Sequence, residues 1–328
     1  MAADDPQVPL ASLPVHDPYV LPLAHDGTYR LYQGVGGDPA GVEVRHSRDL
    51  RTWSAPRRVF SVPDGCWADP TSSPWAPEVH AWGGRFHLFT TLHQPAAELP
   101  APRQGGTSFL LRSDDARWRL TPAARGTVVA VADDPDGPFT LVDPAAPVPP
   151  ADAMTLDGTL VTDRDGRPWM VYAHEWVQLL DGTVEAVPLQ PDLSGAAGPP
   201  VHLFRGSEAS WQADRTPGNT ALAPYVTDGP QLRRLPGGAL ACLWSSYRGR
   251  GTEYVQTWAL SRSGDLTGPW EQREVLVGGG AGHGMLLDTF DGRTALVLHR
   301  GMGTPTVRAE FHEVDVSPDA LTVRPWRW

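Results

Sequence analysis

The sequence predicts an all-β fold, a five-bladed β-propeller with four-stranded antiparallel blades around a central channel. The 34 Gly and 34 Pro residues among 328 leave no room for long helices, which rules out a coiled coil or helical bundle. Short apolar segments alternate with Gly, Pro and Asp instead. One pattern recurs five times: a polar residue, a short apolar strand, a Gly-containing turn and a second apolar strand.

Each copy of this pattern is predicted to be a β-hairpin. The strands are separated by HDG, WGG, RDG, PGG or FDG, which are turn sequences. Three hairpins are followed by a strand, a polar turn that ends on an aromatic residue, and a further strand; of these aromatic residues, Trp53 and Trp270 are expected to pack inside. Two such halves make one four-stranded blade. The aromatic residues are Trp53, Phe139 and Trp270, and the five hairpins begin at Asp17, Pro77, Asp157, Asp228 and His283.

We expect residues 1–328 to form a single propeller domain, with a short N-terminal extension over about 1–13. The first strand of each blade lines the channel of a propeller, so polar residues at the five strand starts converge in space. Asp17, Asp157, Asp228 and His283 are expected at the same position of four blades, with Glu78 one residue into the fifth. The alternative is a generic all-β protein whose acids cap turns.

Charge and hydropathy exclude several classes of partner. The 38 acidic and 27 basic residues give a net charge of −11, which argues against nucleic acids and anionic membranes. No apolar run is long enough to span a membrane, and no secretory signal is visible, so we expect a cytoplasmic protein, or a secreted one if a leader has been removed. Cys66 and Cys242 are expected to be buried thiols. The oligomeric state is left open.

Five short motifs at the strand starts resemble those of glycoside hydrolase family 43, over about residues 14–315. They are His16-Asp17-Pro18-Tyr19, Trp75-Ala76-Pro77-Glu78-Val79, Leu156-Asp157-Gly158, Asp228-Gly229-Pro230 and Gly282-His283-Gly284. The resemblance implies a five-bladed propeller enzyme that cleaves arabinofuranosides and xylosides with inversion of configuration.

The resemblance also implies roles for individual residues. Asp17 would be the general base, Asp157 would orient and tune the acid, and Asp228 stands in the segment that carries the acid. His283 matches the family's central histidine, which often neighbours a Ca²⁺ or Na⁺ ion in the channel. Such an ion would be structural, and no cofactor is required for the chemistry.

The residue types suit this chemistry. Inverting hydrolysis needs one carboxylate to activate water and one protonated carboxyl group to protonate the leaving oxygen, about 6.5–9.5 Å apart. A third carboxylate beside the acid raises its pKa by repulsion between like charges. Acids on different blades across one channel can hold such a separation rigidly.

The identity of the general acid stays open. The family usually has Glu where this chain has Asp228, whose side chain is one methylene shorter. Glu208, in the segment Ser207-Glu208-Ala209-Ser210-Trp211, resembles a second form of the acid motif. Glu175 is a third candidate, and its alternative is a buried carboxylate bonded to Arg or to the backbone.

Aromatic and polar side chains near the strand starts are candidates for sugar contacts, because sugar C–H faces stack on aromatic rings and sugar hydroxyls need hydrogen-bond partners. For the Trp residues and Tyr19 the alternative is packing between blades. The candidates are Tyr19, Trp67, Trp75, Glu78, Glu175, Trp176, Arg248 and His299.

The predicted function is therefore an inverting, exo-acting glycoside hydrolase that removes a terminal sugar from an oligosaccharide or glycan side chain, with α-L-arabinofuranose as the expected sugar. The alternatives are β-xylose or galactofuranose as the sugar, a phosphorylase on the same fold, and a propeller that binds carbohydrate without catalysis. Insertions at about 93–106 and 205–222 are expected to decide between exo and endo action.

Overall fold

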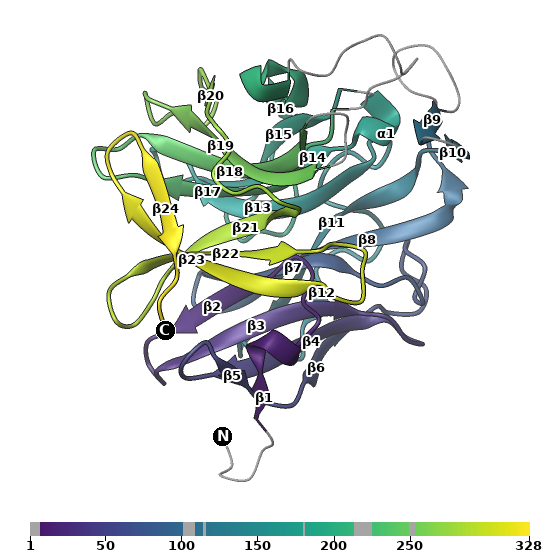
Figure 1. The fold of residues 1–328 in the computed structure, drawn as a ribbon. Coiled ribbons are helices and arrows are strands. Elements are labelled where there is room, and N and C mark those ends of the chain that lie inside the picture. The colour runs from purple at the N-terminus through teal and green to yellow at the C-terminus, as the bar shows by residue number, and fades with distance from the viewer. Residues whose placement is uncertain (1–6, 101–108, 114–115, 180, 213–224, 249–252) are drawn as a thin grey trace.

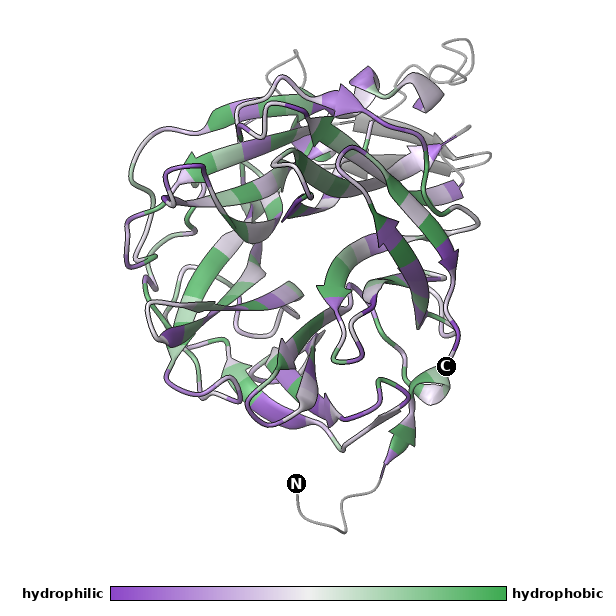
Figure 2. Cartoon of the chain, turned by 90° about the vertical axis from the view of Figure 1, so that its left-hand side faces the viewer, coloured by the Kyte–Doolittle hydropathy of each residue, from purple (hydrophilic) through white to green (hydrophobic). Residues whose placement is uncertain are grey.

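The computed structural model describes residues 7–100, 109–113, 116–179, 181–212, 225–248 and 253–328. Its regular structure is almost all β-strand, arranged as five four-stranded antiparallel sheets in a ring (Figure 1). Seen after a quarter turn, the sheets surround a common centre (Figure 2). The predicted five-bladed propeller is confirmed.

The blades follow one another along the chain, and the first strand of each lies at one edge of its sheet. Blade I contains β2 (Tyr19–Leu23), β3 (Thr28–Val35), β4 (Gly41–Ser47) and β6 (Arg57–Ser61). Blade II contains β7 (Trp75–Trp82), β8 (Arg85–Glu98), β11 (Ala123–Ala132) and β12 (Thr140–Leu141). Blade III contains β13 (Thr155–Thr162), β14 (Pro168–His174), β15 (Thr183–Pro188) and β16 (Val201–Arg205). Blade IV contains β17 (Asp228–Arg234), β18 (Leu240–Arg248), β19 (Glu253–Ser261) and β20 (Glu271–Gln272). Blade V contains β21 (Ala281–Asp288), β22 (Thr294–Arg300), β23 (Arg308–Val316) and β24 (Leu321–Pro325).

Short elements lie outside the blades. Within the expected N-terminal extension, β1 (Val8–Pro9) pairs with β5 (Thr52–Trp53), and η1 (Leu10–Ser12) packs against β23. A hairpin of β9 (Phe109–Ser113) and β10 (Ala116–Leu120) is inserted in blade II. The short helical turns are α1 (Trp176–Leu179), η2 (Gly206–Glu208) and η3 (Ser210–Gln212). The two insertions expected to shape the pocket, 93–106 and 205–222, lie partly outside the described residues.

The first strands of the blades surround the axis. Strand β2 contacts β7, β7 contacts β13, β13 contacts β17 and β17 contacts β21, and the contact between β21 and β2 closes the ring. The predicted hairpins are all present as the first two strands of each blade. The five strand starts therefore meet at one end of the channel, as the repeat predicts.

A local irregularity repeats at these strand starts. In blades II to V, two residues at the start of the first strand leave the regular pairing with the second strand. One residue per blade has a left-handed backbone there, with a φ of +42° to +57°; these residues are Asp17, Ala76, Asp157, Gly229 and His283. The shared backbone conformation defines the equivalent positions of the five blades.

This equivalence corrects the expected position of Asp228 and Glu78 within their blades. Asp228 comes one residue before the position occupied by Asp17, Asp157 and His283, because Gly229 takes that position in blade IV. Glu78 comes two residues after it, because Ala76 takes the position in blade II. The hairpin spacing could not show this, since the irregularity lies before the turn.

Side chains of neighbouring blades satisfy the backbone N–H groups that the irregular starts release from pairing. The N–H groups of Asp157 and Gly158 donate to the hydroxyls of Thr91 and Thr127 in blade II at 2.9 Å. The same arrangement links His283 and Gly284 to Ser245 and Gln256 of blade IV, at 2.8 and 2.6 Å. Each bond fixes a strand start against the preceding blade and so positions the side chain there.

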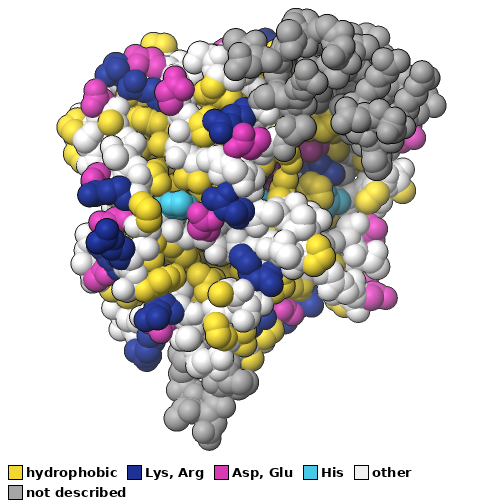
Figure 3. Space-filling model, in the orientation of Figure 1, with side chains coloured by type: hydrophobic (Ala, Val, Ile, Leu, Met, Phe, Trp, Pro, Cys, Tyr) yellow, Lys and Arg dark blue, Asp and Glu magenta, His cyan; other side chains and the backbone are white. Residues whose placement is uncertain are grey.

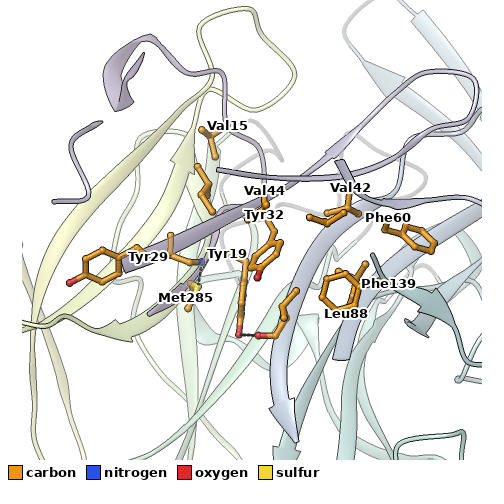
Figure 4. Close-up of a cluster of buried hydrophobic side chains, with 14 of the residues drawn as sticks. Val15, Tyr19, Tyr29, Tyr32, Val42, Val44, Phe60, Leu88, Phe139 and Met285 are labelled. Atoms are coloured by element: carbon orange, nitrogen blue, oxygen red, sulfur yellow. Dashed lines mark hydrogen bonds between the residues drawn. The ribbon is translucent and has the colours of Figure 1, made fainter. Parts of the chain in front are cut away.

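Hydrophobic residues fill the spaces between the sheets. The largest cluster joins blades I, II and V, where Tyr19, Tyr32 and Leu88 pack together (Figure 4). Trp53 is buried in this cluster as expected, and Phe139 of the recurring turn is buried there too. The half-buried Trp270, also expected to pack, lies against a second cluster and contacts Phe204. Of the two free thiols, Cys242 is buried as expected, whereas Cys66 is partly exposed.

Acidic and basic side chains are interspersed on the surface seen in Figure 3. Ion pairs such as Arg233 with Asp288 (2.7 Å) and Arg262 with Glu271 (2.8 Å) neutralise part of the negative charge locally. Among the described residues, no helix has both the length and the apolar character that crossing a membrane requires.

Candidate active site

Four polar residues from four blades meet at the strand starts. The Nδ1 atom of His283 lies 3.2 Å from Asp17 Oδ1, 3.6 Å from Asp228 Oδ1 and 3.9 Å from Asp157 Oδ2. These residues are up to 266 positions apart in the chain, from 17 to 283. The propeller ring thus brings together the three acids and the histidine that the sequence singled out.

Asp17 lies among histidines. Its backbone N–H donates to Nδ1 of His299 at 3.0 Å, and its Oδ1 atom is 3.2 Å from the same nitrogen. Burial acts to raise the pKa of Asp17, but His283, His299 and His16 outweigh burial and hold this pKa well below its ordinary value. Asp17 is therefore ionised throughout the neutral range.

Asp157 and Asp228 form a carboxyl pair next to Asp17. Asp157 is buried, and one of its oxygens accepts the N–H of Gly229 at 3.1 Å. Burial, followed by the charge of Asp228 and a hydrogen bond with it, raises the pKa of Asp157 well above its ordinary value. The pair consequently retains a proton under conditions in which Asp17 has none.

Tyr254, on β19, holds Asp228 from the opposite side. Its hydroxyl donates a hydrogen bond to Oδ2 of Asp228. Its ring stacks on His299 with centroids 5.6 Å apart and planes 11° apart, and a side chain at Gly282 would collide with it. Tyr254 thus connects the residues that hold Asp17 with those that hold Asp228. Sequence analysis missed Tyr254, because an aromatic residue on a third strand also fits ordinary blade packing.

The structure separates the candidates for general acid. Asp228 belongs to the cluster, although its backbone position is shifted by one residue. Glu208 is exposed in η2, and within the described part of the chain no hydrogen bond or ion pair joins it to the three aspartates. Geometry therefore favours Asp228 over Glu208.

Glu175 follows β14 and is buried beside the cluster. Its Oε1 atom is 2.7 Å from NH1 of Arg125, the ion pair that the alternative interpretation of Glu175 anticipated. Burial raises the pKa of Glu175, Arg125 opposes this, and the charge of Asp228 adds to the rise. The guanidinium of Arg125 also lies 4.2 Å from the ring centre of Trp75, which is 42 % exposed. Trp75 thus offers an open aromatic surface beside the acids.

Three of the expected sugar contacts occupy other places. The hydroxyl of the buried Tyr19 donates to the carbonyl of Val79 at 3.0 Å (Figure 4), so it holds blade I against blade II. Glu78 bonds His80 at 2.9 Å and, with Asp17 and His283, lines a narrow hollow at the strand starts. His299 is 0 % exposed and lies 3.2 Å from an oxygen of Asp17, so it contacts Asp17 from within the protein.

The remaining candidates lie at the periphery of the cluster. Trp67 packs against the largest hydrophobic cluster, as expected for a structural tryptophan. Trp176 is half-buried at the start of α1, directly after Glu175. Arg248 forms an ion pair with Glu253 at 2.7 Å.

Comparison with known proteins identifies the family of this chain. The model of the family described as glycosyl hydrolases family 43 matches residues 6–313, nearly the whole chain. The chain belongs to glycosyl hydrolase family 43. Family 43 membership confirms the resemblance seen in the five strand-start motifs.

Relatives of this family 43 chain carry several activities in their names. It is 27 % identical to Xylosidase/arabinosidase 43B of Humicola insolens over 321 residues, which cover 89 % of the chain and 48 % of that protein. The chain thus spans about half the length of this curated relative. An endo-arabinase from Bacteroides thetaiotaomicron is 30 % identical, with a TM-score of 0.77 over 94 % of this chain and 97 % of that one.

A more distant structure supports the fold alone. The α-L-arabinofuranosidase from Lactobacillus brevis is 17 % identical, with a TM-score of 0.68 over 95 % of each chain. The fold is therefore shared among proteins that differ in their named substrates.

Proposed function

We propose that this family 43 protein is an inverting glycoside hydrolase that removes a terminal sugar, with α-L-arabinofuranose as the sugar. The observation that carries the proposal is the pairing of an ionised Asp17 with a proton-retaining pair, Asp157 and Asp228, around one histidine. The names of the relatives, which include an arabinase and a xylosidase/arabinosidase, support a pentose and leave β-xylose as the alternative.

Asp17 serves as the general base. An ionised carboxylate can take a proton from a water molecule that attacks the anomeric carbon. The Nδ1 atoms of His283 and His299 both lie 3.2 Å from the same oxygen of Asp17, and these histidines lower the pKa of the Asp17 carboxyl group so that it stays ionised. The base is therefore oriented and charged before substrate arrives.

Asp228 serves as the general acid, and Asp157 supplies the proton reservoir. Repulsion between two neighbouring carboxylates prevents both from ionising, so one proton stays on the pair and can pass from Asp228 to the leaving oxygen. Tyr254 fixes the Asp228 side chain through its hydroxyl. This hydrogen bond gives the shorter Asp a defined position where the family usually has Glu.

The spacing of base and acid bears on stereochemistry. Asp17 and Asp228 approach the same nitrogen of His283 at 3.2 and 3.6 Å, so these two oxygens are at most about 7 Å apart. That upper limit covers both the spacing of retaining enzymes, about 5–5.5 Å, and the short end of the range for inverting enzymes, about 6.5–9.5 Å, so the spacing by itself does not choose between the two outcomes. The anomer released by the enzyme tests the assignment directly.

The proposal is tested with nitrophenyl glycosides of arabinofuranose, xylose and galactofuranose. We expect turnover of the arabinoside and release of the inverted anomer, observed by proton NMR. Binding of arabinosides without turnover by a folded protein would support the non-catalytic propeller instead. Turnover with retention of configuration would contradict the roles given to Asp17 and Asp228.

The acid is identified by comparing Asp228→Asn with the control Glu208→Gln. Loss of the proton donor should lower kcat by about 10²-fold or more for an alkyl arabinoside. For a nitrophenyl arabinoside kcat should fall much less, because the nitrophenolate group leaves without being protonated. The Glu208→Gln variant should cleave both substrates at wild-type rates. The opposite result, selectivity in Glu208→Gln alone, would move the acid to Glu208.

The structural cation near His283 stays a prediction. One oxygen each of Asp157 and Asp228 and a nitrogen of His283 lie within 4.8 Å of one another, which is ligand spacing. A cation among them would compete with the proton that the carboxyl pair holds, so we derive no catalytic step from it. Thermal melts with and without EDTA, Ca²⁺ and Na⁺ test whether an ion binds.

A further inference from the structure

Three consecutive glycines, residues 278–280, join blade IV to blade V and lead directly into β21. Two bidentate ion pairs lie beside this segment. Arg248, at the end of β18, pairs with Glu253, at the start of β19, at 2.7 and 2.9 Å. Arg300, at the end of β22, pairs with Glu310 on β23 at 2.6 and 3.1 Å. One ion pair therefore belongs to blade IV and the other to blade V.

Both ion pairs also bond the backbone of the segment. Glu253 Oε1 accepts the N–H of Gly279 at 2.6 Å, and NH1 of Arg300 donates to the carbonyls of Gly278 and Gly279. The fit is close, because a Cβ atom at Gly278 would lie 2.8 Å from Glu253 Oε1 and one at Gly279 would lie 2.8 Å from Arg300 NH1. We call the two ion pairs together with residues 278–280 the clasp.

On the side of blade V, the clasp adjoins the residue that holds the base. Arg300 directly follows His299 on β22, and Nδ1 of His299 accepts the N–H of Asp17 at 3.0 Å. Strand β21 begins directly after the glycines, and its residue Gly282 pairs with His299. A shift of the glycine segment therefore moves the strand that pairs with His299.

On the side of blade IV, the clasp adjoins the residue that holds the acid. Glu253 directly precedes Tyr254 on β19, and the hydroxyl of Tyr254 bonds Asp228. The Tyr254 ring stacks on the His299 ring with centroids 5.6 Å apart, and a side chain at Gly282 would collide with the Tyr254 ring. The clasp thus connects the two strands whose stacked rings hold the base and the acid.

The glycine segment depends on the clasp for its position. Glycine has no side chain that could anchor it and has more backbone freedom than any other residue, so bonds to the backbone must fix the segment. Glu253 and Arg300 make such bonds from opposite sides. The side chains of the two ion pairs are 34–42 % exposed, and exposed ion pairs contribute little to stability because water screens them. The clasp therefore acts mainly on position and little on stability.

We propose that Arg300 and Glu253 are positioning residues for the proposed hydrolysis. By fixing residues 278–280, they set the spacing between the base, Asp17, and the acid, Asp228. This inference rests on the proposed function and deepens it. Catalytic groups work only when they are held within about 0.5 Å of their productive positions, so a small movement between blades IV and V affects the rate. In this role neither positioning residue needs to contact sugar.

Removal of each bond to the glycine segment tests the proposal. Arg300→Met and Glu253→Met keep an unbranched side chain and lose the bonds to the segment. A misplacement of about 1 Å costs about 10²-fold in rate, so we expect each variant to lower kcat for an alkyl arabinoside about tenfold, with KM changed by less than about twofold. Glu253→Gln keeps an oxygen that accepts the N–H of Gly279, and its kcat should stay within about twofold of the wild-type value.

Hydrogen exchange gives a second readout that needs no catalysis. The backbone N–H groups of His283 and Gly284 donate to Ser245 and Gln256 of blade IV, so they report how firmly the start of β21 is held. Arg300→Met should make these two N–H groups exchange about tenfold faster, measured by NMR at a temperature at which the variant is folded. Glu253→Met should have the same effect, and Glu253→Gln should not.

Arg233→Met is the matched control for the ion pairs. Arg233 and Asp288 join the same two blades at 2.7 Å, but they lie at the ends of β17 and β21 that are far from the strand starts. Arg233→Met should keep the wild-type kcat and the wild-type exchange of the His283 N–H group.

Gly279→Ala and Gly280→Ala form a second matched pair. Both glycines have a left-handed φ, +75° and +80°, so both variants meet the same backbone cost. Only the Cβ atom at Gly279 would displace the Arg300 guanidinium, because no atom lies within 4 Å of a Cβ at Gly280. We expect kcat to fall in Gly279→Ala alone. Thermal melts show which variants are folded, and Gly279→Ala carries the test if Arg300→Met does not fold.

The outcomes separate this inference from the proposed function. If the wild-type enzyme hydrolyses arabinosides and folded Arg300→Met and Glu253→Met keep its kcat, the positioning role is refuted and the hydrolase stands. An equal loss of kcat in Arg233→Met would also refute the role, because any weakened contact between the blades would then explain the effect. Unchanged exchange of the His283 N–H group in both variants would refute it as well. If wild-type protein cleaves no glycoside, both proposals fail.

Discussion

Replacing Gly229 with Ala tests whether the position of His283 organises the three carboxylates. Gly229 has a φ of +51°, and a Cβ atom there would lie 2.8, 2.9 and 3.0 Å from three ring atoms of His283. Carbon atoms do not pack this closely, so the ring must shift by several tenths of an ångström. That shift changes all three distances from His283 Nδ1 to the aspartates.

The magnitude follows from two separate effects. A left-handed backbone costs a residue with a side chain about 1–2 kcal/mol relative to Gly. The collision adds about 1–3 kcal/mol of overpacking, so Gly229→Ala should lose about 2–5 kcal/mol of unfolding free energy. A misplacement of catalytic groups approaching 1 Å lowers rates by about 10²-fold, and we expect kcat to fall by a large part of that factor.

Gly27→Ala is the matched control. Gly27 has a φ of +65° in the turn between β2 and β3, and no atom lies within 4 Å of its would-be Cβ. This variant should lose only the backbone contribution and keep its wild-type kcat. Urea unfolding gives the free energies, and kcat is measured with nitrophenyl arabinoside at a temperature at which both variants are folded. A folded Gly229→Ala enzyme with wild-type kcat would refute the role given to His283.

Three further predictions follow from the site. Between about pH 3.9 and the raised pKa of Asp157, the folded protein retains a proton that the unfolded chain has released. The unfolding free energy therefore falls as the pH rises through this window, by up to about 1.4 kcal/mol per pH unit. Asp157→Asn should lack this slope in urea titrations across the acidic range, and an unchanged slope would contradict the raised pKa. Tyr254→Phe leaves Asp228 without its hydroxyl partner. We expect kcat for alkyl arabinosides to fall about tenfold and the unfolding free energy to fall by about 1–3 kcal/mol. A wild-type kcat would show that Tyr254 does not position Asp228. A thiol reagent should modify Cys66 alone in the folded protein and Cys242 only after denaturation, because burial shields Cys242 and raises its pKa. Equal labelling of both cysteines in the folded protein would contradict the packing of blade IV.

The blades could be predicted because their signals are local. A hairpin needs turn residues that accept unusual φ values, and Gly27, Gly83, Gly84, Gly166 and Gly237 supply them between short apolar strands. Trp53 and Trp270 were predicted as packing residues for the same reason, since a turn that ends on an aromatic residue recurs. Each of these features depends on a few neighbouring residues.

The strand starts were predicted less completely. Asp17, Asp157 and His283 are equivalent by sequence and by structure. Asp228 is not, because the irregular start of β17 places Gly229 in the shared position and Asp228 before it. A two-residue irregularity leaves no mark on the spacing of hairpins, so the sequence could not reveal the shift.

Residues on the second and third strands of the blades were not identified. Arg125 lies on β11 and Tyr254 on β19, where the alternation of side chains resembles that of any buried strand. Their partners come from other strands or from the neighbouring blade: Arg125 meets Glu175, and Tyr254 meets His299. No pattern within one strand indicates such a contact.

The amino-acid order alone determined the number of blades, their hairpins and the convergence of acids from distant segments, because turn chemistry and strand length act over a few residues. Only the tertiary structure decided that Asp228 and not Glu208 joins the cluster, and that Asp17 is ionised while Asp157 keeps a proton. These properties depend on burial and on charges a few ångströms away that belong to other blades. Such distances exist only after the ring has closed.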